Sequence, residues 1–270
     1  MKYASLRAVL AATGILCALG GLAATSTTAP DAGPKESPPG VAVVELFTSE
    51  GCSSCPSAER VLNDLHASNA KKGGHVYTLA FHVDYWNHLG WPDRFATEAF
   101  TARQRTYADR LGSGVYTPQM VVNGAAEFVG SDRGRADAEI ARALATPAAV
   151  PLTFEVQAGD AATGARPVAI HAPAGAGLGV AAALTHSGLS TSVKRGENSG
   201  RALTHDGVVR AFATGTLDKE GRATVRLALA ADAAAEAGPR EVIVFVYDAK
   251  TPAIKGAAAG AWPSASTPAR

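Results

Sequence analysis

The chain has little of several features that would quickly narrow its function. Only 3 of its 270 residues are cysteine, aromatic residues make up 6% and charged residues 18%, and the formal net charge is +1. Because acids and bases are spread along the chain, no basic surface is predicted that would neutralise nucleic-acid phosphates or hold an anionic membrane. Beyond the N-terminus, no segment stays apolar for the length that a bilayer needs. The sequence therefore argues against a nucleic-acid partner and against a stable membrane span in the mature protein.

The one long apolar run lies at the N-terminus and is short for a membrane span. Residues 8–24 are mostly apolar, follow Lys2 and Arg7, and end in small residues, which is typical of a secretory signal peptide. We expect residues 1–24 to be removed, with Cys17 among them; a retained anchor is the alternative. Residues 25–40, rich in proline, serine, threonine and glycine, are predicted to form a flexible linker. The mature protein would then be periplasmic or secreted, where disulfides persist.

The two cysteines that remain lie between a predicted strand and a predicted helix. Residues 41–47 are apolar and largely β-branched, which predicts a strand buried on both faces. Residues 57–70 carry apolar side chains at helical spacing, and Pro56 suits the first helical turn. A second buried strand, residues 75–84, follows at the distance of a right-handed β-α-β crossover. The sequence GCSSC (residues 51–55) is therefore expected where a parallel strand leads into a helix.

The rest of the first half predicts an insertion and a closing β-β-α unit. Residues 85–113 include a segment rich in tryptophan and histidine and then a polar-faced helix over 97–111. Two short strands flank Asn123-Gly124, a strong signal for a type I′ hairpin. A helix over residues 131–146 follows, with Ser131 as its expected N-cap.

Beyond Pro147 the pattern changes to short alternating runs of apolar and polar residues, separated by glycine, asparagine and aspartate. This favours a small antiparallel sheet or sandwich, so we predict domains at 41–147 and 148–262 and a disordered tail at 263–270. The polar segment between two of these runs is predicted to be a turn or an interface loop. Glu197 and His205 within it are candidates for ligand contact.

Four segments together resemble a known family: ELFTSEGCSSCPSAE, LAFHVDYWNHLGW, VYTPQMVVNG and GENSGRALTHDGVVR. They are similar to a family of secreted bacterial proteins with a thioredoxin-like domain of unknown function. The resemblance implies an α/β fold class: a thioredoxin-like domain with a helical insertion at 85–113, followed by a small mostly-β C-terminal domain. It also implies that the Thr117-Pro118 peptide bond is cis and lies against the cysteine pair.

The chemistry of the cysteine pair follows from its place at a helix N-terminus. Unpaired N–H groups and the helix dipole stabilise a thiolate there, so Cys52 is expected to attack and Cys55 to resolve. We also expect the Cys52 sulfur to lie within reach of solvent and of Pro118. The prediction is an extracytoplasmic thiol-disulfide oxidoreductase that acts on a protein partner without a cofactor. The residues expected to contact that partner are Gly51, Ser53, Ser54, Trp86, His88, Thr117 and Pro118.

Two alternatives remain open at this stage. The first is a metal-binding module in which reduced Cys52 and Cys55 bind Cu(I) and His82 or His88 completes the ligand set. The second is a redox-silent binding domain whose cysteine pair is only a structural disulfide. A structural zinc site built from two cysteine pairs does not fit, because no second pair exists.

Overall fold

The structure is a computed structural model that describes residues 38–72, 74–160, 163–173 and 177–263. These residues fall within one compact unit, Ser37–Arg270. The predicted signal peptide, most of the predicted linker and all but the first residue of the predicted tail lie outside the described residues. Within the described part, no helix combines the length and apolar character that crossing a bilayer requires.

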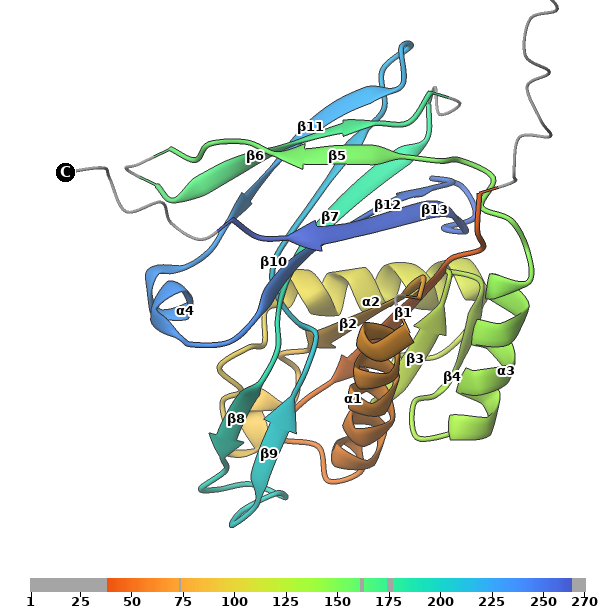
Figure 1. Cartoon of the computed structure of the whole chain (residues 1–270). Coiled ribbons are helices and arrows are strands. Elements are labelled where there is room, and N and C mark those ends of the chain that lie inside the picture. The colour runs from red at the N-terminus through yellow and green to blue at the C-terminus, as the bar shows by residue number, and fades with distance from the viewer. Residues whose placement is uncertain (1–37, 73, 161–162, 174–176, 264–270) are drawn as a thin grey trace, which may run out of the picture. The chain divides into compact units, whose positions relative to one another are not determined.

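An eight-stranded mixed sheet forms the centre of the protein (Figure 1). Its strands, in spatial order, are β13 (Ile254–Ala261), β12 (Arg240–Tyr247), β7 (Gly179–His186), β10 (Val208–Thr216), β2 (Val76–His82), β1 (Ala42–Thr48), β3 (Gln119–Val122) and β4 (Ala126–Val129). The pairs β1–β2 and β2–β10 are parallel, and the other neighbours are antiparallel. A three-stranded sheet of β11 (Arg222–Ala228), β6 (Ala165–His171) and β5 (Thr153–Val156) and a hairpin of β8 (Leu189–Ser192) and β9 (Ala202–His205) complete the strands of the described residues.

The predicted fold class is wrong. Strands from residues 148–262 do not build a small C-terminal domain beside a thioredoxin-like domain with a helical insertion, because four of them continue the sheet of the first half. The junction is β10, which pairs with β2 through Val208 and Ala80, and the Ala80 amide donates to the Gly207 carbonyl at 2.8 Å. The physical reason lies in β7, which is buried along its whole length. A strand of this kind needs cover on both faces, which a small sheet of its own cannot provide.

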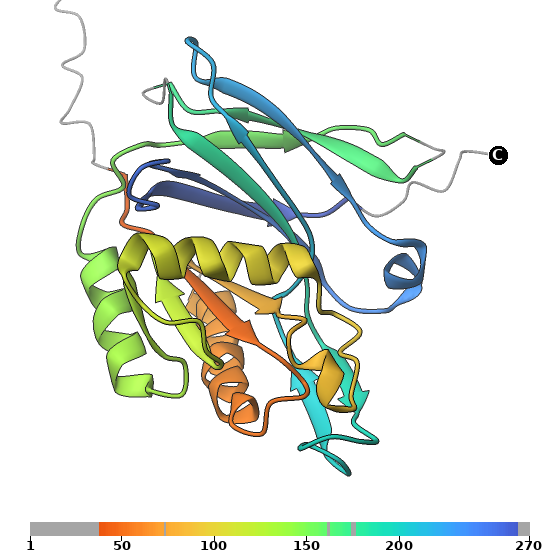
Figure 2. The same cartoon turned by 180° about the vertical axis from the view of Figure 1, so that it is seen from behind.

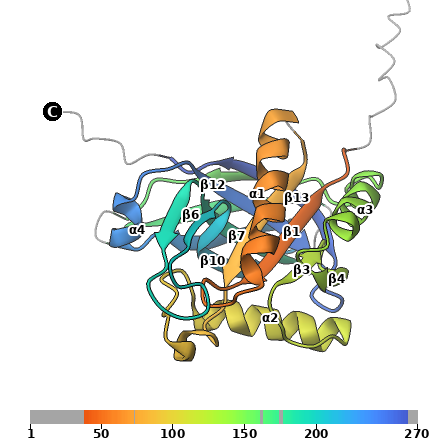
Figure 3. The same ribbon diagram turned by 90° about the horizontal axis from the view of Figure 1, so that it is seen from below.

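Three layers result from the way the helices and the smaller sheet cover the large sheet. One face packs against α2 (Glu98–Leu111), and its core contains Phe47, Phe81 and Phe245 from both halves of the chain. On the other face, α1 (Cys55–Lys72) and α3 (Arg133–Leu144) cover the strands of the first half around Leu46 and Leu62. The three-stranded sheet covers the strands of the second half on that same face. Figures 2 and 3 show α2 on the side opposite α1 and α3.

The local elements of the first half lie close to their predicted positions. The helix predicted over 57–70 falls within α1, and Thr97 is the N-cap of α2, its side chain accepting from the Phe100 amide. For α3 the N-cap is Asp132, and the expected Ser131 is wrong. The predicted insertion 85–113 contains α2 and the short 3₁₀-helix η1 (Asn87–Leu89), and the predicted boundary after residue 147 falls in the loop between α3 and β5.

A buried ion pair ties α2 to the centre of the sheet. Glu45, in the middle of β1, is fully buried and accepts two hydrogen bonds from Arg103, at 2.6 and 2.8 Å. The Tyr107 hydroxyl donates to the same carboxylate at 2.5 Å. Burial works against the charge on Arg103, but Glu45 outweighs it and raises the pKa of the guanidinium further. The Glu45 carboxylate is therefore bound by Arg103 and Tyr107 on the α2 face of the sheet.

Candidate functional site

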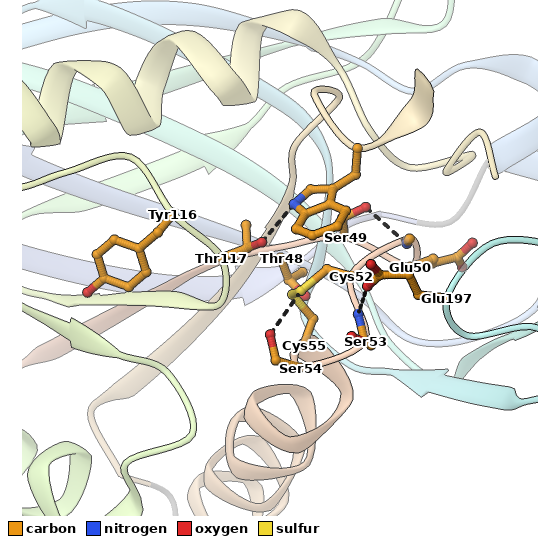
Figure 4. Close-up of a disulfide and its surroundings, with 12 residues drawn as sticks. Thr48, Ser49, Glu50, Cys52, Ser53, Ser54, Cys55, Tyr116, Thr117 and Glu197 are labelled. Carbon is orange, nitrogen blue, oxygen red and sulfur yellow. Dashed lines mark hydrogen bonds between the residues drawn. A yellow bond between two sulfur atoms is a disulfide. The ribbon is translucent and has the colours of Figure 1, made fainter. Parts of the chain in front are cut away.

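The two cysteines of the predicted motif form a disulfide in the turn between β1 and α1 (Figure 4). Their Cα atoms are 5.4 Å apart, and α1 begins at Cys55. The turn is closed by backbone hydrogen bonds from Cys52 to the Ser49 carbonyl and from Cys55 to the Cys52 carbonyl, at 3.1 and 3.2 Å. The predicted position of the pair, at a strand-to-helix junction, is confirmed.

A loop from the second half of the chain lies across this turn. We call residues 193–201, which connect β8 to β9, the cover loop. The Asn198 side-chain amide is fully buried and donates to the carbonyls of Glu50 and Cys52, at 2.9 Å each. Glu197 accepts a hydrogen bond from the Ser53 amide at 3.0 Å, and hydrogen bonds from Ser53 lower the pKa of the Glu197 carboxyl. The cover loop therefore holds the cysteine turn from outside.

This cover changes the accessibility that the sequence predicted. Both cysteines have an exposed fraction of 0%, whereas Ser53 and Ser54 between them are exposed. The expectation that the Cys52 sulfur lies within reach of solvent is wrong for this structure. The turn is packed into the fold by tertiary contacts such as those of the cover loop, which is more than 140 residues away in sequence and so could not be placed on the turn by local pattern. A polar contact remains near the sulfur, since Cys52 Sγ lies 3.3 Å from Ser54 Oγ.

Several of the predicted contact residues meet beside the disulfide. Gly51 lies against Trp86, because a Cβ added to Gly51 would be only 3.3 Å from the Trp86 Cβ. The Trp86 indole N–H donates to Thr117 Oγ1 at 2.8 Å, drawn as a dashed line in Figure 4. The Thr117-Pro118 peptide bond is cis, as predicted. His88 is exposed on η1.

Behind the cysteine turn lies a buried acid–histidine cluster, formed by Glu50, Glu59, His82, Asp93 and His205. All five residues are at most 4% exposed. His205, at the end of β9, has Nδ1 3.0 Å from Glu59 Oε2 and Nε2 3.2 Å from Glu50 Oε1. His82, at the end of β2, has Nδ1 2.7 Å from Asp93 Oδ2. His82 ends β2 and Glu50 follows β1, so the cluster lies at the carboxyl ends of these two parallel strands, where open sheets commonly bind ligands.

The charges within this cluster depend on one another. Burial opposes a positive charge on His205, but the flanking Glu50 and Glu59 outweigh it and raise the pKa of the imidazole to about 10. Burial likewise opposes the negative charge on Asp93, and His82 outweighs it, so that the pKa of this carboxyl is lowered. Both shifts favour the charged form of the group, in a cluster of three carboxyl groups and two imidazoles.

The cluster holds three residues that sequence reasoning missed. Glu50 directly precedes the GCSSC sequence, and an acid next to a cysteine motif was the signal that could have identified it. The sequence pattern places Glu59 on the surface of a helix, but in the structure its side chain accepts a hydrogen bond from the Thr48 hydroxyl at 2.7 Å. Asp93 gave no signal. Asn198, outside the cluster, also gave none. His82, predicted as a possible copper ligand, lies in this cluster, and its contact with Asp93 was not foreseen.

Comparisons with known proteins place the whole described site within one family. The family model described as "Protein of unknown function (DUF1223)" matches residues 43–247, which include the cysteine turn, the cluster and the cover loop. The chain is also similar to a protein from Agrobacterium tumefaciens solved by X-ray crystallography, with 32% identity and a TM-score of 0.59, over 86% of this chain and 98% of that one. No curated protein matches the chain. Because the family model covers well over half of its length, the chain belongs to the DUF1223 family.

Proposed function

We propose that this protein exchanges thiols and disulfides with a protein partner through Cys52 and Cys55. The observation that carries the proposal is the disulfide between two cysteines three positions apart, closed directly before the first turn of an 18-residue helix. When the disulfide is reduced, the free N–H groups at this helix end and the nearby Ser54 hydroxyl stabilise a thiolate on Cys52. A stabilised thiolate is both a good nucleophile and a good leaving group in exchange.

The reaction proposed for the oxidised protein balances as follows. A partner thiolate attacks Sγ of Cys52, the Cys52–Cys55 bond breaks, and its electron pair leaves on Cys55, which takes up a proton. A second partner thiolate attacks the partner's own sulfur in the mixed disulfide and releases Cys52 as a thiolate. The partner loses two electrons and this protein gains them; the reverse sequence reduces a partner disulfide.

Access to the sulfur defines what the partner must contact. The exposed Ser53 and Ser54 are the first residues of the turn that it meets, and Gly51, Trp86 and Thr117 form the adjoining side. Because both cysteines are buried, exchange requires the turn to open, and the cover loop is the segment hydrogen-bonded across it. We place this chemistry in the periplasm or outside the cell, on the strength of the apolar N-terminal run and the disulfide.

A Cys55→Ser variant tests the proposal, because it lets Cys52 form a mixed disulfide that cannot resolve. Expressed from the full chain, it is expected to carry covalent partners that dithiothreitol releases and mass spectrometry identifies. The Cys52→Ser/Cys55→Ser variant is the matched control and should carry none. If the single variant is folded and yet carries no more protein than the double variant, exchange with proteins is refuted.

The burial of both cysteines favours a second candidate, a redox-silent binding domain with a structural disulfide. Structural disulfides of secreted proteins have reduction potentials below about −300 mV, so equilibration with glutathione buffers separates the two functions. An exchange protein is expected to be partly reduced within the range that these buffers cover. A protein that stays fully oxidised throughout that range fits the redox-silent candidate.

A further inference from the structure

The buried acid–histidine cluster offers a metal site that lies apart from the cysteine chemistry. Among the described residues, one group of ligating side chains stands close enough to hold an ion: Glu59, His82 and His205 each provide one ligand atom, and these atoms all lie within 4.8 Å of one another. We propose that these three side chains bind one divalent metal ion of the zinc type, as a structural site behind the cysteine turn. The site involves neither sulfur and does not rest on thiol exchange.

His82 is oriented as a metal ligand would be. Its Nδ1 lies 2.7 Å from Asp93 Oδ2, an oxygen that also accepts the Glu50 backbone N–H at 2.8 Å, so Nδ1 is the nitrogen that donates. In the neutral imidazole, which is the form that binds a metal, the other nitrogen, Nε2, carries a lone pair. It is buried and has no hydrogen-bond partner in the described structure. Histidines that bind metals usually donate their second ring N–H to a carboxylate in this way. A buried acceptor without a donor is costly for a protein, and a cation at Nε2 removes that cost.

His205 supplies the second nitrogen. Its ring nitrogens lie 3.0 and 3.2 Å from carboxylate oxygens of Glu59 and Glu50, yet neither nitrogen has the geometry of a hydrogen bond. The rings of His82 and His205 have centroids 5.3 Å apart. At a metal–ligand distance of about 2.1 Å, the ligand atoms of a tetrahedral ion stand about 3.4 Å apart. The three ligand atoms lie within 4.8 Å of one another, so each pair needs to approach by about 1.4 Å at most.

Three buried carboxyl groups surround the proposed site. Glu50, Glu59 and Asp93 lie in a region that is at most 4% exposed. A divalent ion held by neutral histidines would balance two negative charges there, in place of the protons that its ligands release on binding. Glu50 points one oxygen, Oε2, at the Trp91 indole N–H at 2.8 Å and leaves the buried Oε1 without a hydrogen-bond partner beside the site.

The ligand set and its burial select the class of ion. Two imidazoles and a carboxylate suit Zn²⁺ and related first-row ions, whereas Ca²⁺ and Mg²⁺ need more oxygen ligands. None of the three ligands is exposed to solvent. A structural zinc site usually has four ligands, and the buried Glu50 Oε1, which lies 3.2 Å from His205 Nε2 and has no hydrogen-bond partner, is available for the fourth position. The ion would link α1, β2 and β9, and through β9 it would anchor the cover loop.

The experiment is a refolding titration of the full chain with its disulfide intact. The protein is unfolded in denaturant with a chelator and refolded with Zn²⁺ or Co²⁺, because the buried site is closed in the folded state. After desalting, elemental analysis is expected to find one ion per chain. The Co²⁺ form should show the visible absorption of a tetrahedral N/O site, and the zinc form should unfold at a higher temperature than the metal-free form.

Variants decide which residues hold the ion. Glu59→Gln and His205→Gln are expected to lose metal retention. Asp93→Asn leaves the three ligands in place but alters the acceptor of the His82 ring and of the Glu50 and Phe95 amides, and it should weaken affinity about 10- to 100-fold. His88→Ala, on the surface, and Cys52→Ser/Cys55→Ser should still bind one ion.

The proposal is overturned if the correctly refolded wild-type chain retains no ion, or if Asp93→Asn and Glu59→Gln both bind as tightly as wild type. It is equally overturned if loss of the cysteines abolishes binding. Circular dichroism identifies any variant that fails to fold. If a ligand variant does not fold, the metal affinity of Asp93→Asn is compared with that of the wild type, because this variant keeps all three ligands.

Discussion

Asn198 provides a direct measure of how firmly the cover loop holds the cysteine turn. Its side chain donates two hydrogen bonds to the carbonyls of Glu50 and Cys52, and a hydrogen bond contributes about 1 kcal/mol net. Asn198→Ala should therefore weaken the closed state of the loop by about 2 kcal/mol. Since about 1.4 kcal/mol is a factor of ten, the open state becomes roughly 30 times more populated.

The assay is the rate at which low concentrations of dithiothreitol reduce the disulfide in the folded protein. If the reagent reaches Cys52 only when the loop is open, the rate follows the open population and should rise about 30-fold in Asn198→Ala. Ser199→Ala is the matched control, because the Ser199 hydroxyl bonds within the loop to the Lys194 carbonyl and does not contact the turn. Its rate should stay within about twofold of wild type.

An equal rate in Asn198→Ala and wild type would refute the reasoning, provided that urea unfolding shows both proteins to be folded. It would mean that reduction occurs by a route that the cover loop does not control. A rate increase that equals the loss in global stability would point to unfolding of the whole protein as the step that exposes the sulfurs.

Three further predictions concern the framework around the site. Arg103→Met leaves the Glu45 carboxylate buried without its cation and should lower the free energy of unfolding by about 3–5 kcal/mol in urea titrations. Burial lowers the pKa of His186, so below about pH 6.5 the unfolded chain binds more protons than the folded one; stability should fall as the pH drops through this range, and His186→Gln should reduce that fall. Gly124→Ala, at φ +62° with its new Cβ 2.1 Å from the Pro252 carbonyl oxygen, should cost about 2 kcal/mol or more in thermal unfolding.

Each of these has a control within the chain. Adding Glu45→Gln to Arg103→Met should recover part of the lost stability, and no recovery would show that packing dominates the loss. Gly112→Ala has a similar φ of +66° but no atom within 4 Å of the new Cβ, so it should cost only about 1 kcal/mol. Equal losses at the two glycines would contradict the steric argument, and an unchanged pH dependence in His186→Gln would assign it to other groups.

The first half of the chain was predictable because its signals are local. The apolar run of β1, the helical spacing of α1 and the Asn123-Gly124 turn each lie within a few residues, and all three elements formed as predicted. The N-cap of α3 moved by one residue to Asp132. Such shifts are expected, because neighbouring polar residues compete for the same cap position.

The second half was predicted as strands but joined to the wrong partners. The pairing of β10 with β2 rests on Val208 and Ala80, two residues that no local pattern connects. One signal was present: the runs that form β7 and the centre of β12 are continuously apolar and buried, whereas strands of a half-exposed sheet alternate. The interpretation of these runs as alternating strands of a separate sheet was the error.

The candidate site was predictable only as far as the cysteine motif itself. The sequence placed Cys52 and Cys55 correctly at the junction of β1 and α1, because both neighbours carry strong periodic patterns. It did not foresee Asn198 on top of the turn or His205 behind it, although the segment that contains them was noted as an interface loop. Contacts across such sequence distances depend on the tertiary fold, which propensity does not encode.

The parallel pairing of β10 alongside β2 bears on any attempt to study the cysteine-containing half by itself. A polypeptide that stopped after residue 147 would lose the partner of the Ala80 amide, the Gly207 carbonyl, and would expose the flank of β2 around this residue. Unpaired strand edges recruit strands from other molecules. Such a fragment should aggregate in solution, and its disulfide, without Asn198, would not report on the closed turn of the intact protein.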